Sequence, residues 1–375
     1  MNQGLYLSIR IGSLFNPSPV SQMVIEAITE VQVTNSVGSQ SGFQIKFTLG
    51  KLSPLNNLLQ SGYFDPRSRV IIIATVHGTP QVLMDGIITK QDVTPNNQPG
   101  QSTLTVTGLD LTAMMDFIDL TGIPYPAMPM IAIVNLILAK YAVFGVVPLV
   151  IPNIINLVAN PVERYLQQQG TDYSYLNALA RANGHVFYLN PGPEPGMSIA
   201  YWGPEYSKLT TSQPALSINL DAADNVESLN FSYDGLAARQ YLAVILEENS
   251  GIPIPIPIPE ISILKSPLAK QTPPNLKTAR LEDIAGRGLG QAALRVLGAL
   301  MATPDAISGS GQLDVLRYGH ILKARQLVSV RGGTNYYNGL YQVKSVTHNI
   351  KRGEYKQSFN LVRGGVKSSI ERVSV

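Results

Sequence analysis

The chain has 375 residues and a mass of 40.6 kDa, enough for roughly two to three domains of about 150 residues each. Hydrophobic residues make up 45% of the chain and charged residues only 14%, against about 25% charged residues in typical globular domains. This composition excludes an intrinsically disordered chain. The absence of cysteine excludes disulfide scaffolds, thiolate zinc sites, iron–sulfur clusters and cysteine nucleophiles.

The charge is unevenly distributed along the chain. The formal net charge is +3, but from Arg317 to the last residue eleven Lys and Arg stand against two acids, a local charge of +9. The preceding residues therefore carry 3 minus 9, or −6. Such polarity fits contact with nucleic acid or a membrane surface, the lining of a pore, or an acidic neighbouring subunit. A solvated basic sheet face explains it equally well.

Two segments of the chain are candidates for a targeting or membrane segment, and neither has the required pattern. Residues 1–12 alternate polar and apolar residues and lack the continuous apolar stretch of a signal peptide. Residues 125–162 are mostly apolar, but they contain five prolines together with Asn135 and Lys140, which would leave polar groups unsatisfied in lipid. We expect no membrane insertion, and a buried helix followed by irregular structure in this stretch.

The first hundred residues show the period-two alternation of half-buried strands. Turn signals at residues 77–80 and 96–100 separate the strands at the spacing of a β-sandwich or barrel. We therefore expect a closed or nearly closed sheet. Its strands are predicted over residues 5–11, 23–33, 43–49, 70–76, 81–89 and 102–107.

The period changes near Asp110, where a small α/β region is predicted. Asp110 or Thr112 is expected to cap a short helix that runs through Asp119. Asp172 is the expected N-cap of a later helix, and Gly184 stands where a left-handed C-terminal residue belongs. The predicted elements are helices over residues 130–141 and 172–183 and a strand over 185–189.

The last part of the chain returns to strands. Residues 252–259 alternate isoleucine and proline, which removes every second backbone donor and favours an extended spacer or edge-covering arm over a central strand. The order of β unit, insertion and second β unit suggests two related barrels. The remaining predicted elements are strands over residues 197–202, 215–220 and 226–233, a helix over 281–301, strands over 318–330, 340–348 and 354–363, and a hairpin turn at 349–353.

Patterns that would indicate a metal, cofactor or nucleophile site are weak. His77, His185, His320 and His348 stand singly, without the spacing that places two imidazoles on one metal ion. Residues 286–293 fit a loose dinucleotide fingerprint, but no strand precedes them, so a glycine-rich helix is the better interpretation. Residues 308–311 (Ser-Gly-Ser-Gly) lack the strand and helix of a nucleophile elbow. We expect no catalytic, cofactor-binding or metal-binding residues.

Paired carboxylates need separate attention, because two acids across a cleft suffice for a glycosidase. Asp116 and Asp119 are one helical turn apart, while residues 247–248 and 282–283 are adjacent acids. Helix-end or surface charge explains each pair better, and the sequence favours a protein without enzymatic activity.

Motifs spread over nearly the whole chain resemble one family. Three stand near the C-terminal end: Leu313-Asp-Val-Leu-Arg-Tyr-Gly-His320, Tyr341-Gln-Val-Lys-Ser-Val-Thr-His348 and Gly353-Glu-Tyr-Lys-Gln-Ser-Phe-Asn-Leu361. The others are Phe64-Asp-Pro-Arg67, Gly108-Leu-Asp110, Gly170-Thr-Asp-Tyr173 and Ala200-Tyr-Trp-Gly-Pro204. Together they resemble the late control gene D family, the baseplate hub of contractile phage tails and of phage-derived injection systems.

The resemblance implies a trimeric hub whose subunits each contribute two tube-like β-barrels to a pseudo-sixfold ring. Such a ring lies below the hexameric tail tube and carries a trimeric spike. A threefold object presents six similar edges only if each chain holds two copies of the matching surface. After Arg363 only residues 364–375 remain, so we expect the spike to be a separate chain. The basic C-terminal strands are then candidates for a weak, salt-sensitive contact with DNA or cargo in the lumen, or for a contact with the next tube ring.

We therefore predict an α+β, mainly β protein with two tube-like antiparallel β-barrel domains, a small α/β domain between them and a helical insertion in the second. The predicted domains are residues 1–110, 111–205 and 206–375, the last with the Ile-Pro arm at 252–259 and the insertion at 275–305. The predicted function is a structural hub of a virion tail baseplate or injection particle, assembled in the bacterial cytoplasm with other baseplate proteins. The alternative is a hub-associated peptidoglycan hydrolase that uses Asp116 with Asp119.

Overall fold

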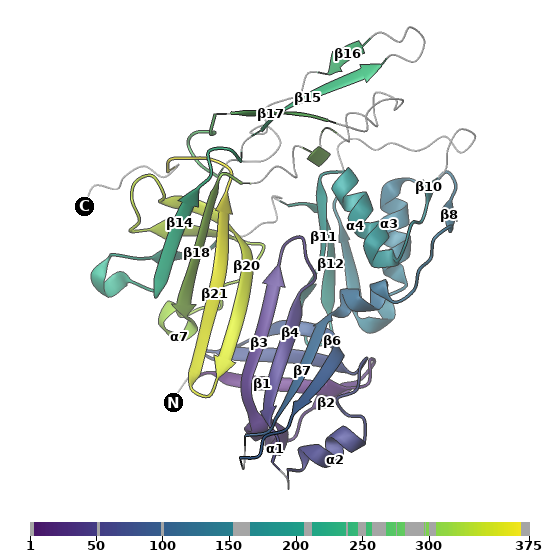
Figure 1. Cartoon of the computed structure of the whole chain (residues 1–375), viewed down its shortest axis with the longest axis vertical. Helices are drawn as coiled ribbons and strands as arrows, with labels where there is room; N and C mark the ends of the chain where they lie inside the picture. Colours follow the sequence, from purple (N-terminus) through teal and green to yellow (C-terminus); the bar gives the residue numbers. More distant parts are fainter. Residues whose placement is uncertain are drawn as a thin grey trace.

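The predicted class is confirmed: the computed structural model is an α+β, mainly β protein dominated by one large, largely antiparallel sheet (Figure 1). The structure describes residues 4–50, 53–98, 101–152, 166–205, 212–237, 239–246, 253–256, 268–274, 276–281, 296, 298–299 and 305–368. Within these residues, the large sheet has thirteen strands, and three smaller sheets flank it.

The N-terminal strands form one half of the large sheet. They are β1 (Tyr6–Gly12), β2 (Pro17–Pro19), β3 (Ile28–Ser36), β4 (Gly42–Thr48), β5 (Arg69–Val76), β6 (Thr79–Thr94) and β7 (Thr103–Asp110), with the short helices α1 (Gln22–Ala27) and α2 (Leu55–Gln60). The strand predicted over residues 23–33 is wrong in its first half, which forms α1. Its buried side chain is Val24, whereas Met23 is exposed, so the short run of apolar residues follows a helix turn instead of a strand face.

The middle of the chain folds as a separate α/β unit with its own hydrophobic core around Ile133, Leu176 and Trp202. Strands β11, β12 and β9 form a three-stranded sheet in that order, and α3 and α4 pack against it. Its elements are η1 (Leu111–Asp116), β8 (Pro124–Tyr125), α3 (Met130–Ala139), η2 (Ala142–Phe144), β9 (Val146–Val150), β10 (Leu166–Gln167), α4 (Asp172–Ala182), β11 (His185–Pro191) and β12 (Ser198–Pro204).

The helix ends of this unit follow the sequence in part. Asp110 caps η1 by accepting a hydrogen bond from the Thr112 backbone N–H, and Gly184 has a φ of +66°, both as predicted. The N-cap of α4 is Thr171, not Asp172. Asp172 is buried and accepts hydrogen bonds from Gln168 and the Tyr141 hydroxyl. Its carboxylate therefore bonds to side chains from elsewhere in the fold and does not cap the helix as predicted. Among the described residues, no helix is long and apolar enough to cross a membrane.

The C-terminal strands form the other half of the large sheet. They are β13 (Ser212–Ser217), β14 (Ser228–Tyr233), β18 (Ile307–Asp314), β19 (Leu327–Arg331), β20 (Gly339–Lys351) and β21 (Glu354–Arg363), with η3 (Asp221–Ala223) and α7 (Val315–Tyr318). The β20–β21 hairpin matches the prediction. The strand predicted over residues 318–330 is wrong in its first part, because Asp314 caps α7 and Gly319 ends it in the left-handed conformation.

The Ile-Pro stretch lies partly in β16 (Pro253–Ile256), an edge strand that pairs antiparallel with β15 (Arg239–Leu246). On its other side β15 pairs in parallel with β17 (Lys277–Arg280). An edge position agrees with the loss of alternate N–H donors to proline. The helix predicted over residues 281–301 lies almost entirely outside the described residues.

The large sheet repeats one strand topology twice. In each half the chain order is a strand, a second strand, a short helix, a short strand, a long strand and a final strand: β3, β4, α2, β5, β6, β7 and then β14, β18, α7, β19, β20, β21. The pairing order is also the same, β3-β4-β7-β6-β5 and β14-β18-β21-β20-β19. We call these two strand sets repeat 1 and repeat 2.

Local details confirm the equivalence of the repeats. The Arg67 N–H donates to Ile88 O in repeat 1, and the Arg325 N–H donates to Val343 O in repeat 2. Both arginines have a positive φ. The residue after Ile88 and the residue after Val343 are each skipped by a bulge in the pairing with the following strand.

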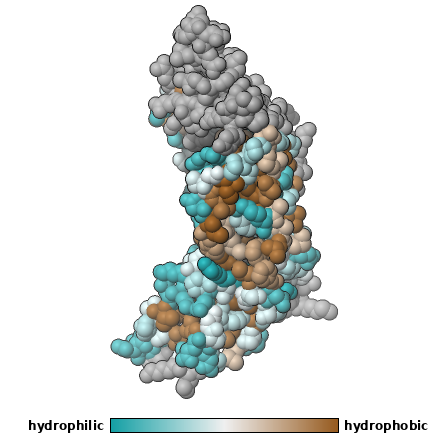
Figure 2. All heavy atoms as spheres, turned by 90° about the vertical axis from the view of Figure 1, so that its right-hand side faces the viewer, coloured by the Kyte–Doolittle hydropathy of each residue, from teal (hydrophilic) through white to brown (hydrophobic). Residues whose placement is uncertain are grey.

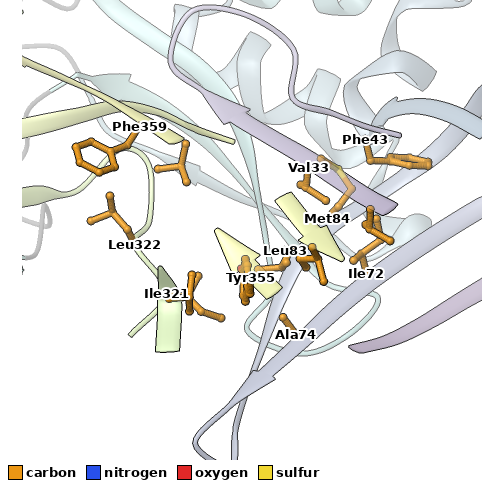
Figure 3. Close-up of a cluster of buried hydrophobic side chains, with 14 of the residues drawn as sticks. Val33, Phe43, Ile72, Ala74, Leu83, Met84, Ile321, Leu322, Tyr355 and Phe359 are labelled. Atoms are coloured by element: carbon orange, nitrogen blue, oxygen red, sulfur yellow. The ribbon is translucent and has the colours of Figure 1, made fainter. Parts of the chain in front are cut away.

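The repeats are joined side by side through β20 and β3, which pair antiparallel over seven residues from Ser345↔Ser36 to Lys351↔Glu30. Their apolar side chains form one continuous core (Figure 3). Val33 and Phe43 come from repeat 1, and Tyr355 and Phe359 come from repeat 2. The two repeats therefore bury their hydrophobic faces in a common cluster.

Candidate assembly surfaces

One face of the large sheet is hydrophilic across both repeats. Residues directly opposite on neighbouring strands share a face, so the strand pairings trace uninterrupted rows of polar side chains. One row runs from Thr34 through Thr347, Ser358 and Gln312 to Ser228. Side-chain hydrogen bonds cross the joint between the repeats: Gln32 Nε2 donates to Asn349 Oδ1 over 3.1 Å, and the Thr34 and Thr347 hydroxyls lie 3.1 Å apart.

The charges of this face are matched. The lysines that belong to it or border it pair with acids: Lys46 and Lys351 with Glu30, Lys356 with Glu227 and Glu354, and Lys90 with Asp92. The other members are Ser, Thr, Asn and Gln, including Gln44, Thr105, Thr107, Asn230, Ser310, Ser345 and Asn360. The basic strands of the C-terminal region thus meet acids from elsewhere in the chain, and the face is close to neutral.

Arg325 joins three parts of the molecule from a buried position. Its guanidinium donates to Ser36 O of repeat 1 and to Leu189 O of the α/β unit, each over 2.8 Å. It lies 4.0 Å from the ring centre of Tyr188. Burial lowers the pKa of Arg325, so these acceptors and the aromatic face compensate a costly buried charge.

A cavity of about 430 Å³ lies beside Arg325, between the β5–β6 turn, the α/β unit and the loop before β19. Asn35, Tyr188, Tyr201 and His348 are among its lining residues. Every guanidinium nitrogen of Arg325 already donates to protein acceptors. The arginine therefore acts as a structural joint, and it offers this cavity no free donor for a ligand.

Arg69 makes a second buried joint. It donates to both carboxylate oxygens of Asp85 over 2.8 Å, and to the carbonyl groups of Leu14, Phe144 and Gly196. Burial raises the pKa of Asp85, and the hydrogen bonds from Arg69 oppose that rise. Because Phe144 and Gly196 belong to the α/β unit, this ion pair fixes that unit against repeat 1.

The α/β unit carries an apolar outer surface, which Figure 2 shows as a cluster of hydrophobic residues. The exposed large apolar residues of this unit include Ile118 (65%), Val143 (64%) and Leu136 (51%). Exposed apolar patches of this kind mark surfaces that other molecules cover. The sequence pattern did not single out this surface, because an apolar residue looks alike in the sequence whether a core or a partner covers it.

The four histidines lie in different parts of the structure. His77 lies in a turn, His320 is exposed, and His185 and His348 are buried. Burial lowers the pKa of His185 to about 4 and that of His348 to about 3. The described residues contain no group of three or more His, Asp or Glu that could hold a metal ion.

The carboxylate pair of the hydrolase alternative is used in loop structure. Asp116 accepts a hydrogen bond from the Thr171 hydroxyl. Asp119 accepts from the Thr121 N–H and hydroxyl, over 2.9 and 2.6 Å, and these bonds lower its pKa. A general acid at neutral pH needs a raised pKa instead, so this geometry does not favour glycosidase chemistry.

The remaining candidates from the sequence are the serine-glycine stretch, two acidic pairs and the glycine-rich segment. Ser308, Ser310 and their glycines form part of strand β18, with no elbow. The acidic pairs at 247–248 and 282–283 and the glycine-rich residues 286–293 fall outside the described residues.

Comparisons with solved structures find this fold in tail proteins. No family model and no curated protein matches the chain. A tail protein from Neisseria meningitidis matches with a TM-score of 0.61 and 14% identity, covering 97% of this chain and 98% of that one. The 43 kDa tail protein of prophage MuSo2 from Shewanella oneidensis matches with a TM-score of 0.64 and 12% identity, covering 96% and 99%.

A third solved structure shares the fold. The PdpA–VgrG complex of Francisella matches with a TM-score of 0.57 and 7% identity, covering all of this chain and 55% of that one. At these identities the likeness shows the fold. Over essentially its whole length, the chain has the fold of the two tail proteins and of part of the PdpA–VgrG complex.

Proposed function

We propose that the protein is a structural hub of a phage tail or of a phage-derived injection system, without enzymatic activity. The observation that carries the proposal is the hydrophilic sheet face that runs without interruption across both repeats. A sheet with one face in a shared core and the other polar and charge-matched is suited to line a water-filled conduit. The shared fold with tail proteins and the motif resemblance to the late control gene D family support this role.

The duplicated topology supports a trimer. Three copies of a chain with two equivalent repeats present six similar units, which is what a threefold ring needs below a sixfold tail tube. We propose that residues 1–110 and 206–375 supply the two tube-like barrel domains and residues 111–205 the outer α/β domain. We further propose that a separate spike chain, the tail tube and other baseplate proteins are the partners, in a particle assembled in the bacterial cytoplasm.

The charge matching of the polar face refines the expected contact with passing cargo. DNA binding requires an excess of basic side chains near the phosphates, and the lysines of this face are paired with acids. We propose a conduit that holds DNA or protein cargo only weakly. A gel-shift experiment at low salt is expected to show no stable complex, and salt-sensitive retention of DNA would contradict this point.

The decisive experiment is the mass of the purified protein in solution. Mass photometry is expected to show three copies, and negative-stain images are expected to show rings with a central channel. A protein that stays monomeric at micromolar concentration and binds neither tube nor spike protein would overturn the proposal. Clearing of peptidoglycan in a zymogram, lost on Asp116→Asn, would instead support the hydrolase alternative.

A further inference from the structure

The polar sheet ends in two edge strands. Its strands follow the order β6-β7-β4-β3-β20-β21-β18-β14, and each neighbouring pair is antiparallel. Strand β5 pairs with β6 only as far as Ile87, so the segment 89–94 of β6 has β7 on one side and no described strand on the other. At the far end, β14 pairs with β18 alone among the described strands.

These edges carry little of the usual protection against pairing: the 89–94 edge has one lysine, Lys90, which is paired with Asp92. Natural edge strands carry proline, charged side chains (lysine above all) or a covering segment. Strand β14 reads Ser-Leu-Asn-Phe-Ser-Tyr, without charge or proline. On the core side of the two edges, Val93 is 48% exposed and Tyr233 is 37% exposed. Both edges therefore present backbone groups together with apolar side chains that a neighbouring strand would cover.

The strand pairing between the two repeats of one chain shows which kind of strand pairs with such an edge. Repeat 2 meets repeat 1 through β20 and β3. In the duplicated topology, β20 is the equivalent of β6, and β3 is the equivalent of β14. The two free edges are thus the same two kinds of strand that already pair within one chain.

We propose that the 89–94 edge of β6 in one copy pairs antiparallel with β14 of the next copy, which continues the polar sheet around a ring. This inference rests on the proposed function and names the surfaces that hold the ring together. The eight strands alternate in direction, so the two edges run antiparallel to each other. Joining copies edge to edge therefore preserves the antiparallel pattern of the whole sheet.

The internal joint also fixes the register. Following the pairings and the shared bulge, Asp92 is the equivalent of Thr347, and Ser232 is the equivalent of Thr34. Since Thr347 lies opposite Thr34, Asp92 should lie opposite Ser232 of the next copy. By the same equivalence, Lys90 should lie opposite Asp234 of the next copy, which brings two opposite charges together.

The two edge strands are displaced relative to each other in a way that fits closure of the sheet into a barrel. Traced from strand to strand, Ser228 lies in the row of Thr34, while Asp92 lies in the row of Glu30. The two edges are thus displaced along the strand direction, as the tilted strands of a closed barrel require.

The test uses engineered disulfides, because the chain contains no cysteine. The Asp92→Cys/Ser232→Cys variant is oxidised mildly and run on a denaturing, non-reducing gel. Directly opposite positions on paired strands are within disulfide range. We expect covalent species that end at three copies, and a covalent dimer when the two single variants are mixed before oxidation.

Two matched controls use the same chain. Thr34→Cys/Thr347→Cys, the equivalent pair inside the chain, should form an intramolecular disulfide and shows that the conditions suffice. Asp92→Cys/Ser228→Cys is displaced from the proposed register by four residues along the six-residue strand β14 and should stay largely uncrosslinked.

The outcomes separate this inference from the proposed function. A trimer by mass photometry without covalent species, while the internal control oxidises, overturns the edge pairing and leaves the hub function standing. Crosslinked ladders that continue past three copies support the edge pairing and overturn the trimeric ring. A monomer without crosslinks overturns both.

Discussion

The two repeats share one topology but treat equivalent positions differently. Val93 in repeat 1 is 48% exposed, whereas its equivalent His348 in repeat 2 is 2% exposed. Arg67 is exposed near the Phe117 ring, and its equivalent Arg325 is buried with all its donors satisfied. The difference lies in the neighbours: repeat 2 is covered by repeat 1 and the α/β unit, while the equivalent edge of repeat 1 is open in a single copy.

The largest effect is expected at the arginine pair. Arg325→Met leaves buried carbonyl groups of repeat 1 and the α/β unit without donors, so the free energy of unfolding should fall by about 3–5 kcal/mol. Arg67→Met, at the equivalent exposed position, should change it by less than about 1 kcal/mol. Urea denaturation of both variants makes the comparison, and equal losses would show that burial does not distinguish the two sites.

A second difference concerns how the repeats fill one cross-strand position. Repeat 1 pairs Phe43 with Gly108, and repeat 2 pairs Gly309 with Leu361. A Cβ atom at Gly108 would lie 2.2 Å from Ile87 O and 2.3 Å from the Phe43 ring. Gly108→Ala should therefore destabilise the protein by about 1–3 kcal/mol or more.

Two variants sharpen this prediction. Adding Phe43→Leu to Gly108→Ala relieves the contact with the ring but not the contact with the backbone, so thermal stability should recover only in part. Gly50→Ala, where no atom lies within 4 Å of the added Cβ, should be close to neutral. Full recovery in the double variant would show that the backbone carbonyl moves aside freely.

The buried histidine makes repeat 2 sensitive to acid. The pKa of His348 is about 3 in the folded protein against 6.5 for the ordinary group, so below about pH 6.5 the unfolded chain takes up a proton that the native site rejects. The free energy of unfolding should therefore fall with pH, by about 2 kcal/mol for this group between pH 7 and pH 5. His348→Gln should remove that part of the slope in denaturant titrations at each pH.

The smallest effect is expected at the open edge of repeat 1. Lys90→Glu would face Asp234 of the next copy with a like charge, so ring dissociation should increase by about two- to fivefold at low salt and less at high salt. Lys90→Gln is the neutral control and should fall between the two. Unchanged dissociation of both variants in mass photometry dilution series would contradict the register.

Much of the strand pattern could be predicted because alternation in the first hundred residues and in the last hairpin is set locally. The errors came where a few residues fit two periods. Residues 23–27 alternate as a strand does, yet form a helix turn, and residues 318–326 lose their strand to the cap at Asp314. Asp172 was misassigned as a cap because Gln168 and Tyr141, which compete for its carboxylate, are placed by the tertiary fold.

The amino-acid sequence alone determined the mainly β class, the absence of thiol chemistry and an excess of basic residues at one end. The tertiary structure decided whether those basic residues stay unpaired or are neutralised by acids. Glu30 and Glu227 come from distant strands and neutralise Lys351 and Lys356, and Arg325 is satisfied by carbonyl groups far away in the chain. A charge acts through its spatial neighbours within a few ångströms. The pairing of β3 with β20, the pairing of β18 with β14 and β21, and the packing of the α/β unit against Arg325 bring those neighbours together.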